Sequence, residues 1–181
     1  FAGTLTAMIA HKLGLRVVLI ERDRHPRFTI GESSTPLANL KLQALAERYD
    51  FPWLTPLCKY GPWQSTYPGI ACGLKRGFSF FRHQPGKPFR PLRDHSNELL
   101  VTANPDRQRG DTHWFRAAFD AFLVERAVEA GVPYLDRFKL ESVWHEDGWR
   151  VVGRRNDAPL EIRADFAVDA TGGGNVLGKA L

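Results

Sequence analysis

The sequence of 181 residues predicts an α/β fold, and three features near its start lead to this expectation. Gly3 opens a segment, 4–13, in which apolar residues recur at helical spacing. A short β-branched strand, 16–20, follows, and Glu21 comes directly after it. A glycine that opens a helix, then a buried strand and an acidic residue, form the second half of a dinucleotide-binding βαβ unit.

The first helix is predicted from its apolar periodicity. Its apolar residues fall at i, i+3, i+4 and i+8, which places them on one helical face that packs on a sheet: Leu5, Met8, Ile9 and Leu13. Gly14 is expected to end the helix in the left-handed conformation. The strand residues 17–20 are apolar on both faces, as is typical of a parallel strand covered by helices.

A second helix is predicted to begin at Pro36 and to end near residues 49–50. Thr35 is a good N-cap, and proline is favoured at the first helical position. The expected apolar face of this helix consists of Leu37, Leu40, Ala44 and Leu45.

Residues 51–111 differ in character, because they are rich in proline and aromatic residues and show no helical periodicity. Segments 77–81 and 99–103 are predicted strands. We interpret 51–111 as an insertion of strands and loops on the substrate side of the fold. The alternative, a disordered linker, is disfavoured by the aromatic content.

Residues 112–181 are predicted to return to the nucleotide-binding domain that begins with 1–50. One helix ends at Gly131, and its apolar residues are Phe115, Ala118, Phe119, Phe122, Leu123, Ala127 and Ala130. Strands are expected at 132–135, 138–145, 149–154, 160–166 and 167–170. The pair Asp147-Gly148 is a hairpin signal between the second and third of these.

Composition narrows the range of partners. The net charge is +5, but the basic residues are interspersed with acids and no nucleic-acid-binding motif accompanies them, so no nucleic-acid partner is predicted. Cys58 and Cys72 form no metal or disulfide pattern, and the histidines His83, His95 and His113 lack metal-ligand spacing. We therefore predict no metal site and a reducing, cytoplasmic location.

The chain has no apolar run near the roughly 20 residues that a membrane span requires, so no membrane association is predicted. It begins without methionine, and no strand precedes the glycine helix. We therefore expect an internal part of a longer protein, with a fold truncated at both ends.

Two glycine-containing segments indicate the cofactor. Gly3 would bring helix N–H groups to a phosphate, and Glu21, 18 positions later, is placed to hold a ribose hydroxyl. Near the end of the chain, Asp169 is followed by Thr171 and Gly172, a strand end that returns to the phosphate and ribityl region of a flavin. The ordinary alternatives are a helix cap, a surface glutamate and a glycine turn. Both segments in one chain favour FAD over NAD.

The order of these features resembles the flavin-dependent halogenases, which are tryptophan-halogenase-like proteins. They belong to a group that includes geranylgeranyl reductases and hydroxybenzoate-hydroxylase-like monooxygenases. The most specific match is to the G-E-S-x-x-P loop, which in the family lies along the flavin: Gly31, Glu32, Ser33, Ser34, Thr35 and Pro36. The resemblance implies a Rossmann-like FAD-binding fold of glutathione-reductase type with a β-rich insertion. Arg27 is expected either to approach the flavin or to be solvent-exposed.

The resemblance also implies a catalytic lysine. In the family, halide attacks a flavin hydroperoxide, and the hypohalous acid that forms is polarised by a lysine or carried by it as a haloamine. Lys75 is the predicted residue, because 75–80 matches the K-x-G-x-x-F context of the family. Lys59 has a glycine at the same spacing but lacks the phenylalanine. The alternative for Lys75 is a solvated lysine at a strand edge.

The function implied is that of an FAD-dependent oxidoreductase that delivers an electrophilic halogen to an aromatic or other electron-rich substrate. Halide is the co-substrate, and a separate flavin reductase supplies reduced FAD. Alternatives are a monooxygenase or isoprenoid reductase of the same fold, or a non-catalytic FAD-binding module. The 181 residues alone are expected to be inactive and to bind FAD weakly or not at all.

Overall fold

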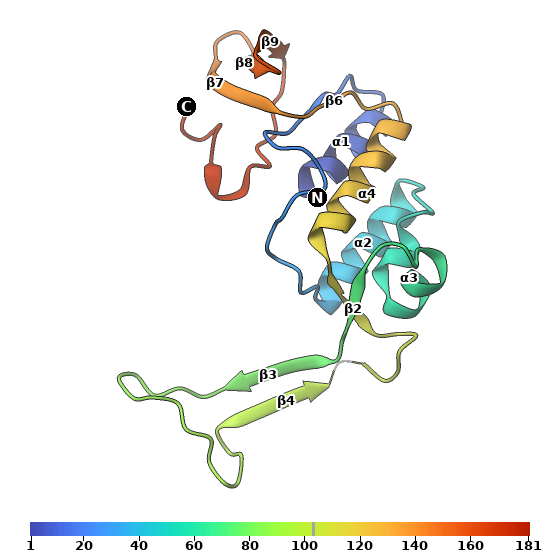
Figure 1. Ribbon diagram of the computed structural model, residues 1–181, viewed down its shortest axis with the longest axis vertical. Coiled ribbons are helices and arrows are strands. Elements are labelled where there is room, and N and C mark those ends of the chain that lie inside the picture. The colour runs from blue at the N-terminus through green and yellow to red at the C-terminus, as the bar shows by residue number, and fades with distance from the viewer. Residues whose placement is uncertain (103) are drawn as a thin grey trace. The chain divides into compact units, whose positions relative to one another are not determined.

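The computed structural model describes residues 1–102 and 104–181, which divide into two units (Figure 1). The first unit comprises Phe1–Thr29 together with Arg116–Leu181, and the central unit is Ile30–Phe115. The predicted division at residues 50 and 111 therefore differs from the observed one. None of the helices in the described residues is long and apolar enough to cross a lipid bilayer.

Two helices and two short parallel strands form the core of the first unit. Helix α1 (Ala2–Lys12) packs against α4 (Arg116–Glu129), and β1 (Leu19–Ile20) pairs in parallel with β6 (Tyr134–Leu135) (Figure 1). The buried apolar residues of this core are Leu5, Ala7, Met8, Phe119, Phe122, Leu123, Val124, Ala127, Val132 and Phe138. The mixed helix and strand content confirms the predicted α/β class.

The ends of both helices follow the prediction. Gly14 and Gly131 adopt positive φ values of 85° and 94°, which glycine adopts at little cost. The predicted apolar face of α1 is correct for Leu5 and Met8, which are buried, but wrong for Leu13, which is exposed. The reason is that α1 ends at Lys12, so Leu13 is the C-cap and lies beyond the last helical residue.

An antiparallel meander completes the ordered strands of the first unit: β7 (Phe138–His145), β8 (Trp149–Arg155) and β9 (Ala158–Ala164). Asp147 and Gly148 both have positive φ at the predicted hairpin turn. The predicted strand at 167–170 is wrong, because this segment is irregular up to the short 3₁₀ helix η2 (Gly172–Gly174). A strand needs a hydrogen-bonded neighbour, and the described residues provide none for 167–170.

The central unit contains two antiparallel strand pairs. β2 (Cys72–Lys75) pairs with β5 (Asp111–Trp114), and β3 (Gly77–Phe81) pairs with β4 (Glu98–Thr102), which form the long hairpin in Figure 1. The last two strands confirm predictions, although residue 103 of the predicted segment lies outside the described residues.

Two helical segments of the central unit were not predicted: η1 (Thr55–Cys58) and α3 (Tyr60–Thr66). Both are short and contain proline, so they carry no helical periodicity. Burial of Trp63 stabilises α3 instead, since its side chain is fully buried and its indole N–H donates to the carbonyl of Ile70 at 2.9 Å.

Helix α2 (Pro36–Arg48) begins as predicted, with the Thr35 hydroxyl accepting a hydrogen bond from the Ala38 N–H at 3.1 Å. Its predicted apolar face is wrong. Leu37 and Leu40 are more than 60% exposed, whereas the buried residues are Asn39, Leu42 and Ala46. The inward position of Asn39, which donates to Asp111 at 2.8 Å, accounts for this orientation of the helix.

Candidate active site

Gly3 lies near the start of α1, against the segment that carries Asp169 and Thr171. A Cβ at Gly3 would be 2.8 Å from the Cβ of Ala170, closer than side chains approach one another. Only a glycine fits here, so the helix and the 169–172 segment can lie in direct contact. Close packing of this kind is the role of the third glycine of a dinucleotide-binding turn.

Replacing Gly3 by alanine is therefore expected to weaken FAD binding by the full-length protein about tenfold, since overpacking costs roughly 1–3 kcal/mol and exceeds the gain in helix propensity. Fluorescence titration with FAD measures the effect. Gly69→Ala is the matched control, because a Cβ there meets nothing within 4 Å. Equal affinities of the two variants would contradict the packing role.

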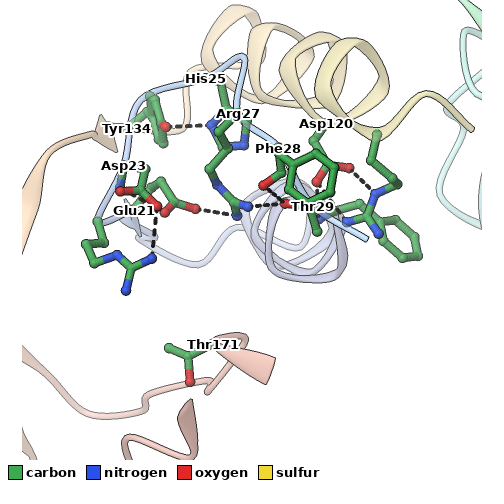
Figure 2. Close-up of polar contacts among 12 residues, drawn as sticks. Glu21, Asp23, His25, Arg27, Phe28, Thr29, Asp120, Tyr134 and Thr171 are labelled. Carbon is green, nitrogen blue, oxygen red and sulfur yellow. Dashed lines mark hydrogen bonds and ion pairs between the residues drawn. The ribbon is translucent and has the colours of Figure 1, made fainter. Parts of the chain in front are cut away.

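Glu21 follows β1, and both of its carboxylate oxygens accept hydrogen bonds (Figure 2). One oxygen accepts from the Asp23 backbone N–H at 3.0 Å, and the other from the Arg27 guanidinium at 2.8 Å. Arg27 also donates to the Thr29 hydroxyl. The Arg27 side chain is partly buried, at 28% exposed, and its hydrogen bond orients Glu21, which differs from the solvent-exposed alternative. A carboxylate has further lone pairs, so Glu21 retains capacity for a ribose hydroxyl.

A hydrogen bond between His25 and Tyr134, which was not predicted from the sequence, connects the loop after β1 to β6. His25 Nδ1 lies 2.8 Å from the Tyr134 hydroxyl (Figure 2). Burial raises the pKa of Tyr134 to about 12 and lowers the pKa of His25. Both side chains are therefore neutral at pH 7, and their hydrogen bond holds the Glu21 loop without a buried charge.

Asp169 organises the glycine turn that follows it. Its carboxylate accepts hydrogen bonds from the Thr171 hydroxyl at 2.6 Å, the Thr171 N–H at 2.9 Å and the Leu177 N–H at 3.0 Å. These bonds, the Thr171 hydroxyl foremost, lower the pKa of Asp169. Gly172 follows with φ of 67°. Figure 2 draws no contact between Thr171 and the Glu21–Arg27 pair.

The G-E-S-S-T-P loop belongs to the central unit and lies along β5. Gly31 has φ of 93°, which favours glycine. Ser34 is buried, and both its N–H and its hydroxyl donate to the Thr112 carbonyl, at 3.2 and 2.7 Å. The Trp114 N–H donates to the carbonyl of Glu32 at 2.7 Å. These backbone bonds fix the loop, while the side chain of Glu32 is exposed.

Lys75 is brought to this loop at the end of β2. Its side chain is only 4% exposed, so the alternative of a solvated lysine is wrong. The ammonium donates to the Ser33 hydroxyl at 2.8 Å and to the Ser34 carbonyl, and it lies 4.0 Å from the centre of the Phe78 ring. Burial lowers the pKa of Lys75, and the charge of Asp111 offsets part of this decrease.

Steric crowding explains the glycine at position 77, two residues after Lys75. A Cβ at Gly77 would overlap the carbonyl oxygen of Val101, where β3 begins to pair with β4. Glycine two positions after Lys75 therefore lets the hairpin start at once and places Phe78 against the ammonium. The K-x-G context thus has a physical basis in this chain.

Asp111 is the residue of this region that the sequence analysis missed. It pairs with Lys75 across the β2–β5 ladder and is 2% exposed. One carboxylate oxygen accepts from Asn39 at 2.8 Å and from Lys59 at 3.0 Å. Lys59, the second candidate lysine, is 37% exposed and binds Asp111 rather than the serine loop. The sequence around Asp111 carries no signal that would single it out, because its role depends on contacts with residues distant in sequence.

Comparison with known proteins places these features in context. No protein-family model matches the sequence. Monodechloroaminopyrrolnitrin halogenase PrnC of Pseudomonas fluorescens is 35% identical over 131 residues, which cover 72% of this chain and 22% of PrnC. Tetracycline 7-halogenase of Kitasatospora aureofaciens is 27% identical over 182 residues, 99% of this chain and 31% of that protein.

Solved structures give the same result. The halogenase PltM, in complex with ethyl mercury and mercury, superposes with a TM-score of 0.81 at 32% identity, over 99% of this chain and 34% of PltM. PltM in complex with phloroglucinol and FAD has a TM-score of 0.75 at 33% identity, over 93% of this chain and 32% of PltM. The chain thus spans about a third of these relatives or less. It belongs to the flavin-dependent halogenases.

Proposed function

We propose that the protein containing this chain is an FAD-dependent halogenase that transfers an electrophilic chlorine or bromine to an electron-rich aromatic substrate. The observation that supports this most strongly is Lys75, a buried ammonium that donates to Ser33 and Ser34 of the G-E-S-S-T-P loop. A desolvated lysine with fixed hydrogen bonds is unusual unless it serves a site. PrnC and PltM, which are similar to this chain, are named as halogenases.

The residues present fit FAD. Gly3 lets the start of α1 pack closely on the 169–172 segment, as the third glycine of a dinucleotide-binding turn does, and Glu21 keeps acceptor capacity for a ribose hydroxyl. Asp169, Thr171 and Gly172 form the second cofactor segment, and the loop from Gly31 to Pro36 is assigned to the flavin side. Bound FAD, when reduced, would supply two electrons to dioxygen, and halide would supply two more as it is oxidised to hypohalous acid.

Lys75 would then act on hypohalous acid. Its N–H donates a hydrogen bond to the oxygen, which weakens the oxygen–halogen bond. As the π electrons of the substrate form a bond to the halogen, the oxygen–halogen bond breaks, and the oxygen takes a proton from the Lys75 ammonium and leaves as water. The ring carbon then loses its proton, which restores the ammonium. Alternatively, the neutral amine forms a bond to the halogen, and the hydroxide leaves as water with a proton from the amine. The nitrogen–halogen bond then breaks as the ring carbon takes the halogen, and the ring proton returns to the nitrogen. An arginine could supply only the hydrogen bond of the first route, because it does not lose a proton in proteins.

We further propose that the complete fold is of glutathione-reductase type, truncated here at both ends, with residues 51–111 as a β-rich insertion. Reduced FAD would come from a separate flavin reductase. The substrate class is inferred from relatives: PltM was crystallised with phloroglucinol, and a further relative, from Pseudoalteromonas luteoviolacea, is named as a brominase of carrier-bound pyrrole-2-carbonyl groups.

The test uses the full-length protein with a flavin reductase, FAD, dioxygen, bromide and phloroglucinol. We expect a brominated product with the bromine isotope pattern in the mass spectrum, formed only when bromide is present. A hydroxylated product independent of bromide would indicate the monooxygenase alternative. FAD binding in a titration without any product would indicate the non-catalytic FAD-binding module, and failure of the full-length protein to bind FAD would overturn the proposal.

A further inference from the structure

We propose that Asp111 is a positioning residue for Lys75: its buried carboxylate sustains the ammonium charge of Lys75, and Lys59 limits this effect by binding the same carboxylate. The inference rests on the proposed function for its catalytic consequence. The geometry that leads to it lies entirely within the central unit.

The first observation is the register of β2 and β5. Lys75 and Asp111 are direct partners in the antiparallel ladder, so their side chains leave the same face of the strand pair. Both residues are at least 96% buried. Their mutual electrostatic interaction is therefore weakly screened by solvent. An uncompensated buried charge is costly, so the Asp111 carboxylate stabilises the ammonium form of Lys75.

The second observation is how the Asp111 carboxylate is used. One oxygen accepts hydrogen bonds from both Asn39 and Lys59. The other oxygen is also buried, but it has no hydrogen-bond partner among residues 1–102 and 104–181. Asn39 holds the carboxylate from α2, and the Asn104 side chain accepts a hydrogen bond from the Asp111 backbone N–H at 3.0 Å. The carboxylate is thus fixed on one side, and its second oxygen remains available to a charge in the site.

The third observation is the second lysine. Lys59 and Lys75 share a single buried anion, so the local charge is one carboxylate against two ammonium groups. The other charged or titratable side chains adjoining Lys75 are Glu32 on the loop, Arg76 after β2 and His113 on β5, and all three are exposed. Solvent screens them, so Asp111 is the charge that opposes the effect of burial on Lys75, and Lys59 acts through the carboxylate that it binds.

The test is the pH profile of the Lys75 amine. Short pulses of acetic anhydride from pH 6 to 11, followed by peptide mass spectrometry, give the midpoint at which Lys75 becomes reactive in the full-length protein. Asp111→Asn keeps the shape and the hydrogen bond from Asn39 but removes the charge. We expect its midpoint to fall and its labelling rate below the midpoint to rise about threefold to tenfold. Lys59→Met removes the competing cation, so its midpoint should rise.

These opposite shifts separate an electrostatic role from a structural one, because a disturbed fold would not move the midpoints in opposite directions. Asp106→Asn, at an exposed aspartate of the same unit, is the control and should leave the midpoint unchanged. If Asp111→Asn does not fold, the Lys59→Met midpoint decides alone. Unchanged midpoints, or shifts in the same direction, would overturn the inference. Amine labelling does not depend on halogenation, so this outcome is separate from failure of the proposed function.

Discussion

Replacing Lys75 by alanine is expected to reduce halogenation by the full-length protein about 10²–10⁴-fold, the range typical of a lost acid–base group. Reduced FAD should still be oxidised, because its reaction with dioxygen does not require the Lys75 amine, which contacts the serine loop and Phe78. Product formation is measured by chromatography and flavin oxidation by absorbance in the same reaction.

Two further variants refine this result. Lys75→Arg retains a cationic donor that cannot lose its proton, so partial activity would indicate hydrogen bonding to hypohalous acid and loss of activity would indicate the haloamine route. Lys41→Ala, at an exposed lysine of α2, is the matched control and should have full activity. Halogenation by Lys75→Ala at the normal rate would refute the catalytic assignment.

The elements that could be predicted from sequence are those with local signals. The Thr35-Pro36 start of α2, the Asp147-Gly148 hairpin and the glycine that ends α4 each depend on a few adjacent residues, and each was confirmed. The prediction of the buried face of α2 was wrong because that face depends on a contact between residues distant in sequence, Asn39 and Asp111. Helical periodicity alone favoured the leucines, whereas a buried polar anchor determined the orientation.

In the candidate site too, features with a local sequence motif were predicted, and features that depend on tertiary contacts were not. Lys75 and the serine loop were identified because their spacing matches a known motif. Their hydrogen bonds, and the role of Asp111, were not predictable, since β2 and β5 carry no strand signal and their register arises from tertiary pairing. The hydrogen bond of Arg27 was also not predictable from the sequence. The sequence predicted that Arg27 either approaches the flavin or is exposed to solvent, and the structure shows that it donates to Glu21.

The largest effect on stability is expected at the buried ion pair of α4. The Arg116 guanidinium donates two hydrogen bonds of 2.8 Å to Asp120, and the two residues are 8% and 1% exposed. Asp120→Ala leaves a buried cation without its carboxylate, which typically costs about 3–5 kcal/mol. We expect hydrogen exchange of the α1 and α4 amides to accelerate accordingly, because these helices share one core.

A double variant distinguishes the loss of the partner from the loss of packing. Arg116→Met with Asp120→Leu removes both charges and keeps apolar volume, so it should recover most of the stability lost in Asp120→Ala. Arg22→Ala, which breaks the exposed pair with Asp23, is the control and should leave the stability nearly unchanged. If the double variant is as unstable as Asp120→Ala, the penalty does not come from the unpaired charge. The ion pair would then contribute through its hydrogen-bond geometry, which apolar side chains cannot replace.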